Sequence, residues 1–193
     1  MKKIFLLLFI AAISLPGFAQ RIKLVEGSAS ALSGQSSINF EFTYDGVRVG
    51  KFSNEKDYIE DKKANYNKKE PGKGDQWEKD WFKDRQARYE PRFIESFNAA
   101  GYSTKQDAQY TIIFNTVFVE PGYNIGISRK NAYIDGVAVL VATSDKSKVL
   151  AKWTVDNAPG SLGWSGMDFD TGVRITECYA TAGKRLGRLI HGK

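Results

Sequence analysis

Five carboxylates fall where predicted strands or helices end, and pairs of carboxylates can carry out hydrolysis. They are Glu120, Asp135, Asp156, Asp168 and Asp170. Glycoside hydrolysis needs two carboxyl groups that flank the scissile bond, and it needs no histidine. The sequence therefore permits a carboxylate-dependent polysaccharide hydrolase with Glu120, Asp168 and Asp170 as its acidic site. Carboxylates at element ends are also ordinary surface residues, so this hypothesis ranks second.

Two glycine-containing segments, 120–131 and 158–169, favour a binding function instead. Each carries an aromatic residue, Tyr123 in the first and Trp164 in the second, and the first adds Arg129 and Lys130. Aromatic faces beside cations can hold a glycan, an anionic envelope polymer or a protein strand. We therefore predict a ligand-binding site of Tyr123, Arg129, Lys130 and Trp164. The equally favoured alternative is that the two aromatic residues close the ends of the hydrophobic core.

Two short motifs are similar to known sites but do not complete them. The sequence "GWSG" at 163–166 lacks the last glycine of a nucleophile elbow. The sequence "DFDTG" at 168–172 has acidic residues but not the glycine position or the ligand spacing of a calcium loop. Asp170 is better explained as the N-cap of the last helix, although a cation there stays an alternative.

The scarcity of histidine and cysteine excludes several chemistries. The one histidine, His191, lies two residues from the end of the printed sequence, and the one cysteine, Cys178, lies on the apolar side of a predicted helix. Ser-His and Cys-His nucleophiles, multi-histidine metal sites and an internal disulfide are therefore excluded. We expect a buried, inert thiol, no cofactor, no metal and, in the binding hypothesis, no catalytic residue.

Hydrophobic periodicity predicts the elements that would position these residues. Strands with alternating or fully apolar patterns are predicted at 22–26, 38–44, 109–120, 132–143 and 148–157. A polar helix starts at a Ser53 cap, an aromatic helix starts at an Asp75 cap and is interrupted near Glu90 by Pro91, and a last helix follows Asp170. The predicted class is α+β: a two-layer sandwich with an antiparallel or mixed sheet of about five strands and two main helices on one face.

Two helical stripes are predicted to form most of the core. The first stripe is aromatic and is expected to pack on the sheet; it comprises Trp77, Trp81, Tyr89, Phe93 and Phe97. The second lies on the last helix and comprises Ile175, Tyr179, Ala182, Leu186 and Leu189. A line of small residues beside it, including Gly183 and Gly187, predicts close approach to the sheet or to another helix.

The last three strands are joined in succession, which predicts an antiparallel meander. This path brings segments 120–131 and 158–169 to the same end of the sheet. The second face of the meander is too apolar to be left in water, since it carries valines and isoleucines such as Ile113, Val137 and Val139. We expect the N-terminal strands and the polar helix to cover that face or, failing that, a second subunit.

The N-terminal segment "MKKIFLLLFIAAISLPGFAQ" has the basic, apolar and small-residue regions of a secretory signal peptide. We predict cleavage between Ala19 and Gln20, which makes the protein periplasmic or secreted. The remainder, 20–193, is predicted to be a single α+β domain with a polar helical insertion at 53–74. No nucleic-acid-binding module is recognisable, and we expect no transmembrane segment in the mature chain.

Four segments carry a resemblance to known proteins: "KKEPGKGDQWEKDW", "EPGYNIG", "AYIDG" and "DFDTGVRITECYATAGKRLG". Through them the chain resembles a group of small exported bacterial proteins of unknown function. More remotely, its element order is similar to the domain of curli-secretion-type envelope-assembly lipoproteins, although the lipid-acceptor cysteine is missing. The leading hypothesis is a non-catalytic exported domain that binds or organises a cell-envelope component, either a glycan or a protein.

Overall fold

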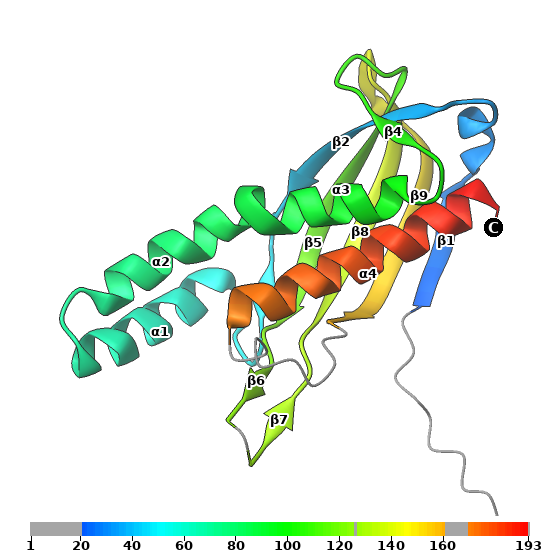
Figure 1. The fold of residues 1–193 in the computed structure, drawn as a ribbon. Helices are drawn as coiled ribbons and strands as arrows, with labels where there is room; N and C mark the ends of the chain where they lie inside the picture. Colours follow the sequence, from blue (N-terminus) through cyan, green and yellow to red (C-terminus); the bar gives the residue numbers. More distant parts are fainter. Residues whose placement is uncertain (1–20, 126, 161–169, 193) are drawn as a thin grey trace, which may run out of the picture.

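The computed structural model describes residues 21–125, 127–160 and 170–192. Its main element is a seven-stranded sheet with the strand order β1-β9-β8-β5-β2-β4, in which β3 also pairs with β5 (Figure 1). A separate two-stranded ribbon is formed by β6 and β7. The strands are β1 (Arg21–Gly27), β2 (Ser37–Thr43), β3 (Arg48–Val49), β4 (Ser103–Thr104), β5 (Tyr110–Glu120), β6 (Tyr123–Asn124), β7 (Arg129–Lys130), β8 (Tyr133–Ala142) and β9 (Asp145–Pro159).

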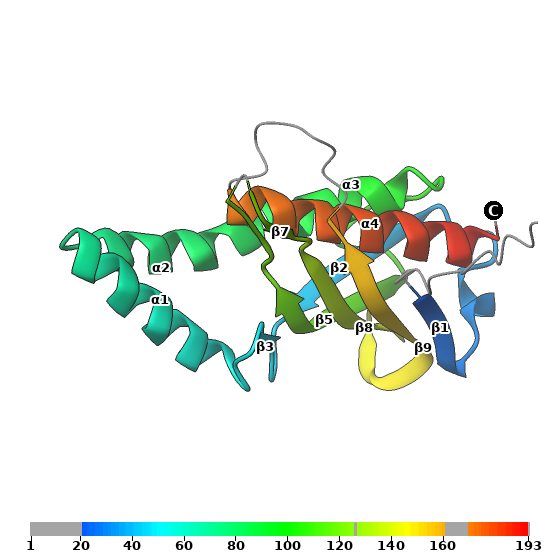
Figure 2. The ribbon, with the colours of Figure 1, turned by 90° about the horizontal axis from the view of Figure 1, so that it is seen from below.

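Helices α3 and α4 lie side by side across one face of this sheet, as Figures 1 and 2 show. The predicted α+β class, with a mixed sheet and two main helices on one face, is therefore confirmed. The sheet has seven strands rather than about five. The helical elements are a 3-10 turn (Ala29–Leu32), α1 (Glu55–Lys69), α2 (Lys73–Asp84), a π-helical turn (Arg85–Tyr89), α3 (Glu90–Asn98) and α4 (Thr171–His191).

The predicted meander of β5, β8 and β9 is confirmed, because both pairs are antiparallel. Strand β1 adds to β9 in the antiparallel sense, whereas β2 runs parallel to β5, which makes the sheet mixed. Glu120 and Pro159 both pair with Tyr133. The ends of β5 and β9 therefore lie at one end of the sheet, which we call the ribbon end.

The core lies between the sheet and the helices α3 and α4. Phe93 and Phe97 of α3 are fully buried, and their ring centroids lie 6.0 and 5.0 Å from that of Phe40 on β2. Phe93 also contacts Phe114 on β5, with 4.7 Å between the ring centroids. The C-terminal half of the aromatic stripe therefore packs on the sheet, as its spacing predicts.

Close packing of α3 against α4 explains the line of small residues on α4. A Cβ atom at Gly183 would lie 2.3 Å from the Phe93 carbonyl oxygen, so a larger residue there would push the helices apart. The stripe on α4 is buried as far as Leu186, but Leu189 is 49% exposed, which corrects the prediction. Ile190 packs against the core instead, because it follows Leu186 by four residues and shares its helix face.

The expected interruption near Glu90 is confirmed, and a π-helical turn causes it. Helix α2 ends at Asp84, the π turn spans Arg85–Tyr89, and α3 starts at Glu90. Pro91 lies directly after this turn, at the start of α3, where it has no N–H group to continue the hydrogen-bond ladder of an unbroken helix.

Helices α1 and α2 form a helical hairpin, which we call the arm, that projects beyond the sheet (Figure 1). Trp81 is buried against Tyr58 of α1, with 5.2 Å between ring centroids, and Trp77 contacts Tyr66 at 5.8 Å. The prediction that Trp77 and Trp81 pack on the sheet is therefore wrong, because α1 covers their side of α2.

The helix starts of the arm also differ from prediction. Asn54, not Ser53, caps α1, and its Oδ1 accepts a hydrogen bond from the Asp57 backbone N–H at 2.9 Å. Helix α2 begins at Lys73, so Asp75 lies inside its first turn. Oδ1 of Asn67, on the neighbouring helix, accepts from the Gly74 N–H at 2.6 Å. Because Asn67 lies on a different helix, a capping rule that uses only the residues next to the start of α2 cannot predict this hydrogen bond.

The second face of the sheet is not covered by the N-terminal strands, and that expectation is wrong. Strands β1 and β2 pair edge to edge with β9 and β5, so they widen the sheet instead of covering it. Helix α1 packs against α2 and β3. Figure 2 shows the helices of the described chain on one side of the main sheet or beyond its edge. Ile113, Val137 and Val139 remain partly exposed; a second subunit on this face stays a prediction.

Candidate functional site

The ribbon end of the sheet holds all three of the described residues that were predicted to bind a ligand. The β6–β7 ribbon projects there beyond the main sheet (Figure 1), and Figure 2 shows it on the side of the sheet that carries the helices. Tyr123 pairs with Lys130 and Asn124 with Arg129. Beyond these pairs, the Ile125 N–H donates to the Ser128 carbonyl at 3.0 Å. Segment 120–131 is therefore a short β-ribbon of its own, not only a long connection.

The ribbon exposes its largest apolar side chains to solvent. Ile127 is 97% exposed, Ile125 63% and Tyr123 43%. Tyr123 and Ser128 share a hydrogen bond of 3.2 Å between their hydroxyl oxygens. Tyr123 therefore does not close the end of the core, which was the alternative for this residue. Its ring is partly available to a ligand, together with the two isoleucines.

A buried arginine holds the base of the ribbon. Arg174, in the first turn of α4, is 5% exposed. Its Nε donates to the Pro121 carbonyl at 3.1 Å and its Nη2 to the Gly122 carbonyl at 3.2 Å and to Thr171 Oγ1 at 3.0 Å. These bonds connect the start of α4 to the start of the ribbon, so the ribbon has a fixed base although its tip is in water.

Glu120 and Lys130 form a second connection at the same base. Glu120 is 8% exposed, and its Oε2 lies 2.5 Å from Lys130 Nζ. Glu120 Oε1 also accepts from the Gly122 N–H at 3.1 Å. The hydrogen bond to Glu120 raises the pKa of Lys130. The carboxylate proposed for catalysis and the cation proposed for binding therefore stabilise each other and fix the ribbon.

A hollow of about 530 Å³ lies beside the ribbon, at the start of β8 and the end of β9. Asn157 has the positive φ of 54°, which non-glycine residues rarely adopt, and its N–H donates to Asp135 Oδ1 at 2.7 Å. Burial raises the pKa of Asp135, and the neighbouring charge of Asp156 acts in the same direction. Tyr133 and Lys130 complete the side of the hollow next to the ribbon.

Asp170 lies at a different site, between α4 and the arm. Its Oδ1 accepts from the Gly172 and Val173 N–H groups at 2.7 and 3.4 Å, so the predicted helix cap is confirmed. Its Oδ2 lies 3.2 Å from Arg88 Nη1, while Arg88 Nε lies 3.2 Å from Asp84 Oδ1. A hollow of about 610 Å³ adjoins this carboxylate–arginine–carboxylate group and the aromatic residues of the arm. Burial raises the pKa of Asp84.

The structure thus brings Tyr123, Arg129 and Lys130 together with Glu120 at the ribbon. Arg129 Nε donates to Asn131 Oδ1 at 3.1 Å. Asp170 has other partners, and Trp164 and Asp168 lie outside the described residues.

Three residues of the ribbon end were missed by sequence reasoning: Ile125, Ile127 and Arg174. The alternation of Tyr123, Ile125 and Ile127 was a signal for a strand, but the loop-like Pro121 and Gly122 obscured it. The one sequence signal for Arg174 was its position as an arginine next to the apolar stripe of α4. Its carbonyl partners could not be predicted from that position, because they are about fifty residues away in sequence.

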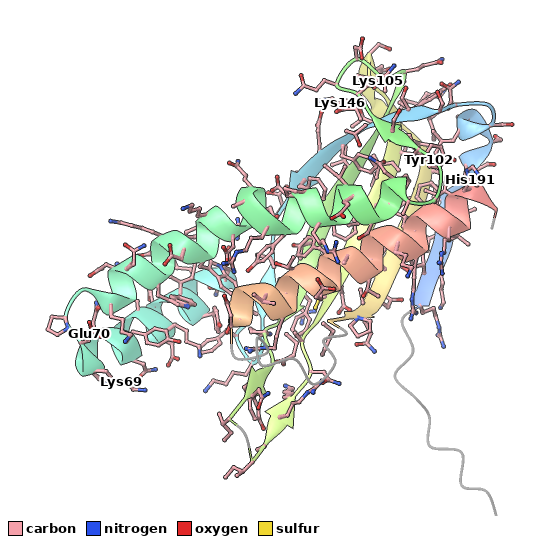
Figure 3. The ribbon with its side chains drawn as sticks, in the orientation of Figure 1. Lys69, Glu70, Tyr102, Lys105, Lys146 and His191 are labelled. Carbon is pink, nitrogen blue, oxygen red and sulfur yellow. The ribbon has the colours of Figure 1, made fainter. Side chains whose placement is uncertain are left out.

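The remaining candidates for chemistry have ordinary structural roles. Cys178 is fully buried, as predicted, and burial raises the pKa of its thiol. The His191 ring lies edge-on to Tyr102, with 5.4 Å between centroids, far from the ribbon (Figure 3). Among the residues described, no group of three or more His, Cys, Asp and Glu side chains is placed to hold a metal ion. In the same part of the chain, no helix is long and apolar enough to cross a membrane.

Comparisons with known proteins give only a distant structural likeness. No protein-family model matches the sequence, and no curated protein matches it either. Among solved structures, the PelC dodecamer from Paraburkholderia phytofirmans is 12% identical with a TM-score of 0.37, covering 85% of this chain and 97% of its own. A leucine-to-methionine variant of that PelC gives 12% identity, a TM-score of 0.38 and coverages of 85% and 98%. TM-scores this low carry no argument about function.

Proposed function

We propose that this protein is an exported, non-catalytic α+β domain that binds or organises a cell-envelope component through the ribbon end of its sheet. The observation that carries the proposal is the ribbon itself: its apolar side chains are in water while its base is fixed. Soluble monomeric proteins rarely expose grouped large apolar side chains without a binding role. A fixed base lowers the entropy cost of binding, because the ribbon does not have to be ordered by its partner.

The N-terminal segment supports export, and the resemblance to small exported bacterial proteins supports an envelope role. Both remain part of the proposal. An intact mass that begins at Gln20 would support the expected cleavage, whereas a mass that retains the first 19 residues would contradict it.

Capture from a cell-envelope extract tests this function directly. The purified protein is immobilised and compared with a ribbon variant, Ile125→Ser/Ile127→Ser, and with a control variant, Leu189→Ser. Leu189 is also an exposed apolar residue, but it lies near the C-terminal end of α4. We expect wild type and control to retain the same component and the ribbon variant to lose it. Equal capture by all three proteins would contradict a role for the ribbon.

Trp164 provides an independent variant for the same assay. Because it belongs to the predicted binding set, a folded Trp164→Ala protein is expected to capture less of the envelope component. Circular dichroism and the thermal midpoint serve to show that the variant is folded. Unchanged capture would remove Trp164 from the site while leaving the proposal for the ribbon intact.

The second candidate function is a carboxylate-dependent polysaccharide hydrolase, which one observation favours. Asp84 and Asp170 flank Arg88 at the hollow beside the aromatic arm, although Glu120 is committed to Lys130. Asp84→Asn and Asp170→Asn remove one charge each, and Asn at 170 can still cap α4. Release of soluble sugar from envelope polysaccharide that both variants abolish would favour this function. Release that persists in both variants and in Glu120→Gln and Asp168→Asn would exclude it.

A further inference from the structure

We infer that the tip of the β6–β7 ribbon enters the interfacial region of a lipid bilayer that contains anionic lipids. This inference rests on the proposed function, because it names the envelope component that the ribbon contacts. Among the described residues, the tip carries Ile125 and Ile127, which are 63% and 97% exposed. Isoleucine gains free energy by leaving water, and a bilayer surface receives it without a matching pocket.

The order of residues along the ribbon matches the depth profile of a bilayer surface. The isoleucines lie at the tip beside Ser128, Asn124 and Arg129 form the next pair, and Tyr123 and Lys130 form the pair nearest the sheet. A strand rises about 3.3 Å per residue, so Ile127 and Lys130 are separated by roughly 10 Å along the ribbon. Interfacial protein segments bury their apolar side by about 5–10 Å, and tyrosine is favoured at the level of the headgroups. The cations would then lie at the level of the phosphates.

The charge of the ribbon favours anionic lipids. Between Pro121 and Ile134 the sequence contains Arg129 and Lys130 and no carboxylate. Glu120 balances Lys130 at the base, so the attraction is modest and the isoleucines supply most of the binding. Salt should therefore weaken the interaction without abolishing it.

The size of the ribbon makes a protein partner a weaker choice. A stable protein interface takes about 20–30 residues on each side, whereas the ribbon and its turn span only the segment from Tyr123 to Lys130. A narrow apolar tip with a fixed base can enter a bilayer without further contacts. The bonds from Arg174 to the Pro121 and Gly122 carbonyls keep that tip pointing away from the sheet.

Co-sedimentation with lipid vesicles tests the inference. The full chain is expressed with its N-terminal segment in a bacterial host and purified in the form that is recovered. It is mixed with vesicles of phosphatidylethanolamine and phosphatidylglycerol, or with vesicles of phosphatidylcholine alone. We expect sedimentation with the anionic vesicles, a partition coefficient at least about tenfold lower for Ile125→Ser/Ile127→Ser, and no change for Leu189→Ser. A smaller loss, of about fivefold or less, is expected for Arg129→Gln.

Each outcome separates the lipid inference from the proposed function. Equal sedimentation of the tip variant and wild type overturns the lipid inference, because the isoleucines then contribute nothing. So does the absence of wild-type sedimentation with anionic vesicles. If the protein also retains tip-dependent capture from envelope extract, the partner is a glycan or a protein and the proposed function stands. Failure in both assays overturns both proposals.

Discussion

The arm and the ribbon both project beyond the sheet, but the residues at their tips differ in polarity. The arm turns Trp81 and Tyr58 toward each other and presents charged residues at its tip, where Lys69 and Glu70 lie (Figure 3). The ribbon has the reverse arrangement, with Ile125 and Ile127 at its tip in water.

The bases of the two projections are alike. Glu55 in the first turn of α1 accepts hydrogen bonds from Trp81 Nε1 at 2.7 Å and from Arg85 Nη2 at 2.5 Å. Arg85 lies over the Tyr44 ring that follows β2, which connects the arm to the sheet. At the ribbon, Arg174 has the corresponding role. A fixed base is therefore common to both, and the exposed apolar tip is the feature that distinguishes the ribbon from the arm.

The largest expected effect concerns the packing inside the arm. Trp81→Ala should lower the free energy of unfolding by about 3–5 kcal/mol, because it removes a buried indole and leaves a cavity between α1 and α2. Phe82→Ala is the control, since Phe82 is the next residue but 43% exposed, and a cost below about 1 kcal/mol is expected. Urea denaturation measures both. Similar costs for the two variants would show that the arm is not packed as described.

Removing the hydrogen bonds that hold the base of the ribbon should have the next largest effect on stability. Arg174→Met leaves the Pro121 and Gly122 carbonyls without the guanidinium, and unpaired buried polar groups cost free energy. We expect a loss of about 2–4 kcal/mol of stability and faster amide hydrogen exchange in the ribbon. Lys184→Met, an exposed position on the same helix, is the control. Unchanged exchange in the ribbon would mean that Arg174 does not hold it.

The pH dependence of stability should differ in sign between the two ends of the sheet. Burial raises the pKa of Asp135 at the ribbon end, so its contribution to stability is fully present below the ordinary Asp value and is lost as pH rises through the folded pKa. Hydrogen bonds from Ser147 lower the pKa of Asp145 at the opposite end, so its contribution is lost as pH falls. Both are expected to be small.

Asn substitutions of Asp135 and Asp145 measure this difference in the pH dependence of stability. The stability of Asp135→Asn relative to wild type should increase with pH from about 4 upward, and Asn can still accept the Asn157 N–H. The stability of Asp145→Asn relative to wild type should decrease with pH over the acidic range. Urea denaturation between pH 3 and pH 7 gives both curves, and parallel curves would contradict the assigned causes.

Local patterns were sufficient for much of the fold. Alternation identified β5, β8 and β9, and their succession placed Glu120 and Pro159 at one end of the sheet. The side chain of Asp170 caps α4 through its own neighbours, so a local pattern predicts it. These features depend on residues that are close in sequence, which is why periodicity and capping rules detect them.

Features that depend on distant partners were missed. Trp77 and Trp81 have the spacing of a core stripe, but only the position of α1 decides that they pack on the arm instead of the sheet. Arg174 finds its acceptors about fifty residues upstream. The sequence identified Tyr123, Arg129 and Lys130 as candidates, whereas the exposure of Ile127 follows from how the ribbon leaves the sheet.

The smallest expected effect on stability gives the sharpest test of the comparison. Ile125→Ser/Ile127→Ser at the ribbon tip should change the free energy of unfolding by less than about 0.5 kcal/mol, because neither side chain is buried in the core. Lys73→Ala at the arm tip, which breaks an exposed ion pair with Glu70, should leave stability unchanged within error.

The two tip variants should differ in binding alone. Envelope capture should be lost with the ribbon variant and kept with Lys73→Ala, although both fold as wild type does. A clear loss of stability in the ribbon variant would mean that the isoleucines serve the fold. If the isoleucines are instead neutral for stability and required for capture, they are exposed because they contact a partner and not because the fold needs them. The ribbon, rather than the arm, is then the part of the molecule that binds the partner.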